Sequence, residues 1–198
     1  MQERERGRRL RQIQAADDRE HLGHTLELSK RFVEDFPDFP YGWIYLGDSL
    51  YGLARYSEAL RAFRRALRLC PREKRFLVHV RLGHLHSRKG NLVRAEAWYR
   101  KAIAGNPSNA SYRIFLGGLL AIAGRLREAE AVHRQATNCK KGRIDEAYLN
   151  LGLVLRAQER YEEALKCFRK ALKTDPRYAE AKKEIADVRK VLQFALRP

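Results

Sequence analysis

The fold of this chain is decided by residues 43–71, which read WIYLGDSLYGLARYSEALRAFRRALRLCP. In this stretch Gly47 is followed twelve residues later by Ala59, and Phe63 comes four residues after that. Small residues at these positions let two helices approach closely, and the ring fills the remaining space. Pro71 ends the second helix, because proline lacks a backbone N–H and clashes with the preceding turn. The stretch therefore predicts an antiparallel helical hairpin.

The same pattern occurs four times. A Leu-Gly pair opens each copy, at Leu46-Gly47, Leu82-Gly83, Leu116-Gly117 and Leu151-Gly152, and the glycines are 36, 34 and 35 residues apart. An alanine, a ring and a second alanine recur at fixed offsets, as Ala59, Phe63 and Ala66, then Ala95, Tyr99 and Ala102, then Ala129, His133 and Ala136, then Ala164, Phe168 and Ala171. One hairpin cannot bury its apolar face alone, so the copies are expected to stack.

This pattern resembles the tetratricopeptide repeat, whose signature is W-x2-L-G-x2-Y, then A-x3-F, then P, over about 34 residues. The second and third copies depart from it at the Trp position, with His79 and Arg113. The third copy also lacks the closing proline and has Lys141 followed by Gly142. The resemblance implies an all-α fold, a right-handed superhelix of antiparallel helix hairpins, and no strand is expected.

Apolar stripes extend the helical pattern to both ends of the chain. One stripe comes before Pro37 and another lies in the last twenty residues. We therefore expect an N-terminal hairpin that departs from the repeat pattern and a C-terminal capping helix with a wet outer face. The predicted organisation is a leading hairpin, four repeats and a cap, with the bounds 1–39, 40–75, 76–109, 110–144, 145–178 and 179–198.

The charge is concentrated in the middle of the chain. The net charge is +17, and +15 of it lies in residues 40–144. Such a field attracts anionic partners, mostly at low salt. The residues expected to form a basic outer face are Arg61, Arg64, Arg65, Arg68, Arg100 and Lys101. This face is either a solvated surface or a stripe that binds nucleic acid, a membrane phosphate or an acidic protein.

The sequence contains no recognisable catalytic or nucleotide-binding motif. No phosphate-binding glycine loop, metalloprotease helix or nucleophile elbow is present. The three cysteines are widely spaced and form no C-x-x-C pair, and most histidines fall on packing positions. We therefore expect no enzyme activity, no cofactor and no metal site.

In the family that the chain resembles, the first helix of each repeat lines a concave groove for an extended or helical peptide. The residues that fall on this lining are Tyr41, Ile44, Tyr45, Asp48, Val80, Arg81, His84, Arg88, Ile114, Phe115, Leu149, Asn150, Leu153 and Arg156. Some of the apolar members are expected to pack against the neighbouring repeat instead. The set does not match the Lys and Asn clamp of family members that grip chaperone carboxylates, and Asp48 would repel such a ligand.

The resemblance therefore implies a non-catalytic protein-binding scaffold or adaptor. Two alternatives remain open at this stage. One is a helical-repeat protein that binds RNA or phosphate through the basic face, and the other is a regulatory part of a larger enzyme. The odd number of unpaired cysteines, the charged N-terminus and the lack of a long apolar run lead us to expect a cytoplasmic protein without a transmembrane segment.

Overall fold

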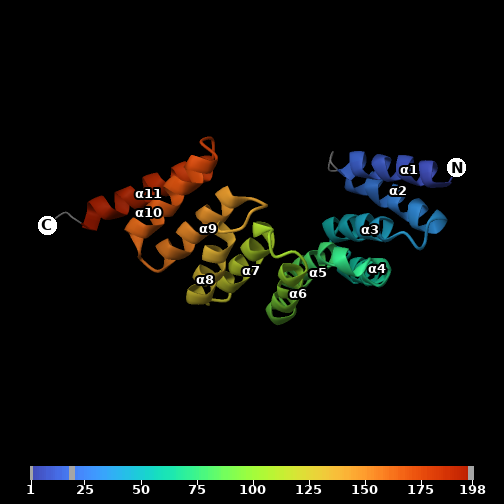
Figure 1. Ribbon diagram of the computed structural model, residues 1–198, viewed down its shortest axis with the longest axis horizontal. Helices are drawn as coiled ribbons and strands as arrows, with labels where there is room; N and C mark the ends of the chain where they lie inside the picture. The colour runs from blue at the N-terminus through green and yellow to red at the C-terminus, as the bar shows by residue number, and fades with distance from the viewer. Residues whose placement is uncertain (1, 18–20, 196–198) are drawn as a thin grey trace. The chain divides into compact units, whose positions relative to one another are not determined.

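The computed structural model describes residues 2–17 and 21–195, and their regular structure is helical apart from one isolated bridge between Asn109 and Lys141 (Figure 1). The α-helices are α1 (Gln2–Asp17), α2 (Leu22–Asp35), α3 (Pro40–Gly52), α4 (Tyr56–Leu69), α5 (Phe76–Arg88), α6 (Leu92–Gly105), α7 (Ala110–Ile122), α8 (Leu126–Thr137), α9 (Ile144–Ala157), α10 (Tyr161–Thr174) and α11 (Ala179–Ala195). A short 3₁₀ helix, η1 (Arg72–Lys74), precedes α5.

The chain divides into two compact units, Met1–Trp98 and Tyr99–Pro198. In the first unit α1, α2, α3, α4 and α5 each pack against the next helix. In the second unit α7, α8, α9, α10 and α11 do the same, and the first helices α7 and α9 also contact each other. Each unit is thus a stack of antiparallel hairpins (Figure 1). The all-α solenoid expected from the sequence is confirmed.

The turn inside each repeat requires one residue in the left-handed region. The four residues at this position are Ala54, Gly90, Gly124 and Glu159, with φ of 58°, 72°, 75° and 61°. The next N–H in each repeat bonds back to a carbonyl of the first helix, from Arg55 to Leu50, Asn91 to His86, Arg125 to Leu120 and Arg160 to Leu155, at 2.8–3.0 Å. This bond closes the first helix in a Schellman-type cap.

The second helices begin with a repeated ion pair. Three of them start just after an arginine whose guanidinium takes a carboxylate three residues later in two hydrogen bonds, in the pairs Arg55–Glu58, Arg125–Glu128 and Arg160–Glu163. In the second repeat Asn91 caps the helix, and its Oδ1 accepts from the Arg94 N–H at 3.1 Å. The glutamates lie in the first turn, where the helix dipole favours negative charge.

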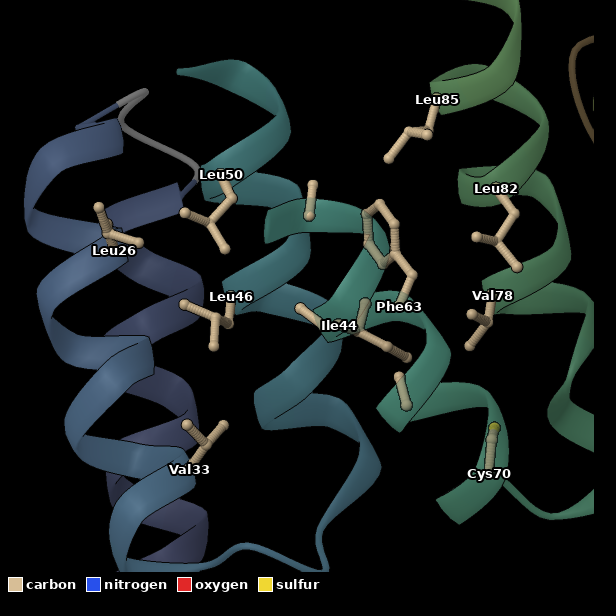
Figure 2. Packing of buried hydrophobic residues seen from close by; sticks show 13 residues of the cluster. Leu26, Val33, Ile44, Leu46, Leu50, Phe63, Cys70, Val78, Leu82 and Leu85 are labelled. Carbon is tan, nitrogen blue, oxygen red and sulfur yellow. The ribbon is translucent and has the colours of Figure 1, made fainter. Parts of the chain in front are cut away.

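A glycine of the first helix lies directly against the ring of the second helix. A Cβ on Gly117 would lie 2.5 Å from the His133 ring, and Gly47 and Gly152 lie equally close to Phe63 and Phe168. The ring is almost completely buried in every repeat, as are the alanines that flank it in the sequence pattern. Figure 2 shows Phe63 of α4 between side chains of α3 and α5, which places the core between consecutive helices.

The third repeat ends differently, as the missing proline indicates. The Ala110 N–H donates to the Lys141 carbonyl at 2.8 Å, and the Lys141 N–H donates to the Ser108 carbonyl at 3.1 Å. Gly142 follows with φ of 89°, and a Cβ there would lie 2.5 Å from Oδ1 of Asn109. The connection between α8 and α9 is therefore tied to the start of α7, and it needs glycine for both conformation and space.

The Trp position has a polar function that explains one of its departures. Nε1 of Trp43 donates to the Pro37 carbonyl at 2.8 Å. At the same position in the third repeat, Nη1 of Arg113 donates to the Pro107 carbonyl at 2.6 Å. Both prolines lie six residues before the donor, so the arginine keeps the hydrogen bond of the tryptophan without its ring.

The two adjacent glycines of α7 should respond oppositely to alanine. Gly117→Ala places a methyl group against the His133 ring and should destabilise the chain by about 1–3 kcal/mol. Gly118→Ala meets no atom within 4 Å and should stabilise it by about 0.5–1 kcal/mol, because alanine loses less entropy in a helix. Thermal unfolding followed by circular dichroism measures both. Equal shifts for the two variants would contradict the packing described for α7.

His133 should make the fold sensitive to acid. Burial lowers the pKa of His133 from 6.5 to about 4, and its Nδ1 has no hydrogen-bond partner. Between these pH values the unfolded chain binds a proton that the folded chain does not, so acid removes up to about 3 kcal/mol of stability. His133→Phe should abolish this part of the loss and raise stability at neutral pH, because phenylalanine fills the same position in repeats one and four.

Denaturant unfolding of wild type and His133→Phe at pH 7, 6 and 5 measures the difference. His84, whose pKa burial also lowers to about 4, is present in both proteins, so its contribution cancels. A wild type and a variant whose stabilities fall in parallel between pH 7 and 5 would show that His133 does not titrate as described.

Candidate functional site

The first helix of each repeat presents the residues that the sequence assigns to a groove, and the structure sorts them by exposure. The four aliphatic residues that are buried in the packing of the hairpins are Ile44, Val80, Ile114 and Leu149. Those that remain half-buried are Tyr41, Tyr45, Asp48, Arg81, His84, Phe115, Asn150, Leu153 and Arg156, while Arg88 is exposed. The aliphatic residues therefore support the surface from behind, and the half-buried ones form it.

In the first unit this surface is occupied by an ion pair. Nε of Arg81 donates to both carboxylate oxygens of Asp48, at 2.9 and 2.7 Å, and Nη1 donates to the Leu77 carbonyl at 2.8 Å. Burial raises the pKa of Asp48, and Arg81 opposes this shift. Arg81 is thus already committed to a carboxylate of its own chain, which leaves it little capacity to orient the carboxylate of a ligand.

His84 lies beside this pair on the same helix. Burial, together with the positive charge of Arg81, lowers its pKa from 6.5 to about 4. The imidazole is therefore neutral at physiological pH. It offers one donor and one acceptor and no charge to this part of the surface.

The second unit contains an apolar cavity of about 250 Å³. Its lining comes from α7, α8 and α9 and comprises Gly118, Ala121, Leu126, His133, Asn150, Leu153, Val154 and Ala157. Gly118 leaves open space where a side chain would point. His133, the unusual ring of the third repeat, forms part of its wall. It can receive an apolar group, and Asn150 supplies a polar group at its edge.

A second cavity of about 240 Å³ lies between α9 and α11. We name it the acidic cavity, and its lining comprises Glu146, Leu149, Asn150, Leu153, Tyr178, Glu180 and Glu184. Asn150 and Leu153 of α9 line both this cavity and the apolar cavity, so the two cavities are neighbours on α9. Burial raises the pKa of Tyr178, and the carboxylates of Glu146 and Glu180 raise it further.

Asn150 lies where the two cavities meet. Its Nδ2 donates to the Glu146 carbonyl, one helical turn earlier, at 2.9 Å. This bond fixes the orientation of the amide and leaves Oδ1 on the side away from the helix backbone. An amide held in this way can accept a hydrogen bond from the main chain of a bound peptide.

The sequence did not identify all of these residues. Tyr178, Glu180 and Glu184 belong to the segment that begins the capping helix, which was expected only to shield the last repeat. Arg156 was assigned to the groove lining, and the structure pairs it with Glu184 of α11. Arg156 and Glu184 are 28 residues apart, which does not match the repeat spacing of 34–36 residues, so the repeat pattern gave no signal for this contact.

The predicted basic face is placed on α4 and α6. Arg61, Arg64 and Arg68 are exposed on α4, whereas Arg65 is half-buried and pairs with Asp38 at 3.1 Å. Arg100 and Lys101 are exposed on α6. Arg61 approaches Glu58 only at 4.0 Å. In each unit these residues are thus mostly exposed, and on α4 a part of their charge is balanced within the chain.

The histidines, cysteines and carboxylates of residues 2–17 and 21–195 form no group of three or more that could hold a metal ion. In the same residues no helix combines the length and the apolar character that crossing a membrane requires.

Comparison with known proteins identifies relatives of this chain. It is 36% identical over 93 residues to human tetratricopeptide repeat protein 7A, a match that covers 47% of this chain and 11% of that protein. It is 28% identical over 134 residues to human protein O-mannosyl-transferase TMTC1, with 68% and 15% covered. The chain thus spans less than a sixth of the length of these relatives.

Solved structures share the fold. The chain matches the Cut9 and Hcn1 complex of the APC/C with a TM-score of 0.75 at 18% identity, over 93% of this chain and 36% of that one. It matches YrrB, described as a TPR protein with an unusual peptide-binding site, with a TM-score of 0.62 at 20% identity, over 88% and 89% of the two chains.

Family models for the tetratricopeptide repeat match residues 26–74, 44–110, 80–143 and 145–178. Together these matches cover the four repeats recognised in the sequence and the second helix of the leading hairpin. These matches support a scaffold for protein interactions that is built from repeats. The chain belongs to the tetratricopeptide repeat family.

Proposed function

We propose that this chain is a non-catalytic scaffold that binds a segment of a partner protein along the first helices of its repeats. In the second unit the binding surface consists of the apolar cavity and the acidic cavity, with Asn150 and Leu153 between them. The observation that supports this proposal is that Asn150 and Leu153 of α9 line both cavities. A peptide of a few residues can place side chains in both while its main chain passes Asn150.

The chemistry of the titratable groups supports a binding role over a catalytic one. Burial raises the pKa of Cys70 and of Cys167, which disfavours the reactive thiolate. His84 and His133 have pKa values of about 4, far below the range in which an imidazole exchanges protons readily at neutral pH. Within a longer protein, including one with an enzymatic domain, the same role would serve to hold a partner.

The three cysteines support a reducing environment for this scaffold. Cys70, Cys139 and Cys167 are free, and the first and last are buried in repeat packing as small apolar side chains. We propose a cytoplasmic location on this ground.

Peptides selected from a phage-displayed random library on the wild-type chain would test the proposal. Leu153→Ala and Phe115→Ala should each weaken the selected peptides about tenfold, because each removes a half-buried apolar side chain from the first helices of the second unit. Fluorescence anisotropy measures the affinities, and circular dichroism checks that the variants keep their helical content.

Val93→Ala is the matched control, because Val93 is an apolar side chain that is 80% exposed on α6, a second helix outside the proposed surface of first helices. Arg64→Ala tests the rival basic face on α4. The proposal would be contradicted by selected peptides that keep full affinity for Leu153→Ala and Phe115→Ala, or that lose affinity for Arg64→Ala alone. Either result would show that the peptides bind outside the first helices.

A further inference from the structure

We propose that the second unit selects a partner segment in which a bulky apolar side chain lies close in sequence to a lysine or arginine. This inference rests on the proposed function and specifies its ligand. The apolar side chain occupies the apolar cavity, the basic side chain enters the acidic cavity, and the main chain between them contacts Asn150.

The acidic cavity suits a cation because of its composition. Its seven lining residues include three glutamates, one tyrosine and no basic residue. A lysine ammonium or an arginine guanidinium would donate to the carboxylates and lie against the Tyr178 ring. This local preference is opposite to the net charge of +17 of the whole chain.

The three carboxylates are not equally available. Glu146 lies 3.2 Å from Nη1 of Arg143, and Glu184 pairs with Arg156. Each ion pair leaves further acceptor positions on the carboxylate. Glu180 is exposed in the first turn of α11 and makes no ion pair with a described residue. We therefore assign the main contact with the basic side chain to Glu180.

The apolar cavity carries an independent sign of a ligand. His133 is 1% exposed and forms part of the wall, and its Nδ1 has no hydrogen-bond partner in the described chain. A buried ring nitrogen without a hydrogen-bond partner is unfavourable. A peptide group or a water molecule that reaches it from the cavity would supply the missing hydrogen bond. The remaining lining is aliphatic or glycine apart from Asn150, which suits a branched or aromatic side chain.

Two variants alter the cavities without touching the core. Gly118→Leu fills the apolar cavity, and the helix tolerates it because a Cβ on Gly118 meets no atom within 4 Å. Glu180→Lys reverses the charge of an exposed residue that makes no ion pair in the described chain. The matched control is Glu162→Lys, which makes the same charge change at an exposed position of α10 outside both cavities.

Random linear peptides displayed on phage are the probe, selected at about 0.15 M salt, where long-range attraction is screened beyond about 8 Å. Peptides selected on the wild type should be enriched in lysine or arginine close to a bulky apolar residue. Their affinity should fall about tenfold or more for Gly118→Leu and for Glu180→Lys, and it should stay within twofold for Glu162→Lys.

The outcomes separate this inference from the proposed function. Acidic peptides that bind through Leu153 and Phe115 would overturn the inference and keep the scaffold with its groove. Basic peptides that bind Glu180→Lys and Glu162→Lys equally would also overturn it. A selection that yields no peptide dependent on Leu153 or Phe115 would overturn both. Enrichment of the apolar and basic pair, with loss of affinity in the two cavity variants and in the Leu153 and Phe115 variants but not in Glu162→Lys, supports both.

Discussion

The contact between a glycine of the first helix and a ring of the second is the constraint on which each hairpin depends. At Gly47, Gly117 and Gly152 the absence of a side chain lets the ring reach the helix backbone, and this fixes how closely the two helices approach. The buried alanines on either side of the ring are also small, so they keep the two helices close along the rest of the interface. The second helix packs its apolar face in this contact. The outward face of the first helix is not needed for the contact, so it can bind a partner.

The fold could be predicted because this constraint is local and restricts residue identity. The close approach of two helices restricts the contact positions to glycine or alanine. These residues therefore recur in the sequence with the period of the repeat. The site could not be predicted to the same depth. Ile44 and Tyr45 are neighbours on one helix, and only the packing of the adjacent helices buries the first and leaves the second half-exposed. The pairing of Asp48 with Arg81 likewise joins two repeats through side chains that carry no periodic pattern.

The distribution of charge gains a different meaning once the contacts are known. Some arginines of the central repeats belong to ion pairs, such as Arg125 with Glu128, so their charge is balanced locally and the excess comes from the other basic residues. The second unit adds a local field of the opposite sign between α9 and α11. Net charge therefore describes how this molecule attracts a partner, whereas the arrangement of a few carboxylates determines which side chain it can hold.

The hydrogen bond that Trp43 and Arg113 each make to a proline carbonyl has a consequence for how such repeats diverge. In these two repeats the turn before the first helix is held by a long side chain with an N–H at its tip, and both an indole and a guanidinium provide one. Drift between an indole and a guanidinium can then proceed without loss of the turn. Two repeats that differ by this exchange share less sequence identity than structure. A comparison that counts hydrogen-bond donors at this position would therefore detect a similarity that a comparison of aromatic residues misses.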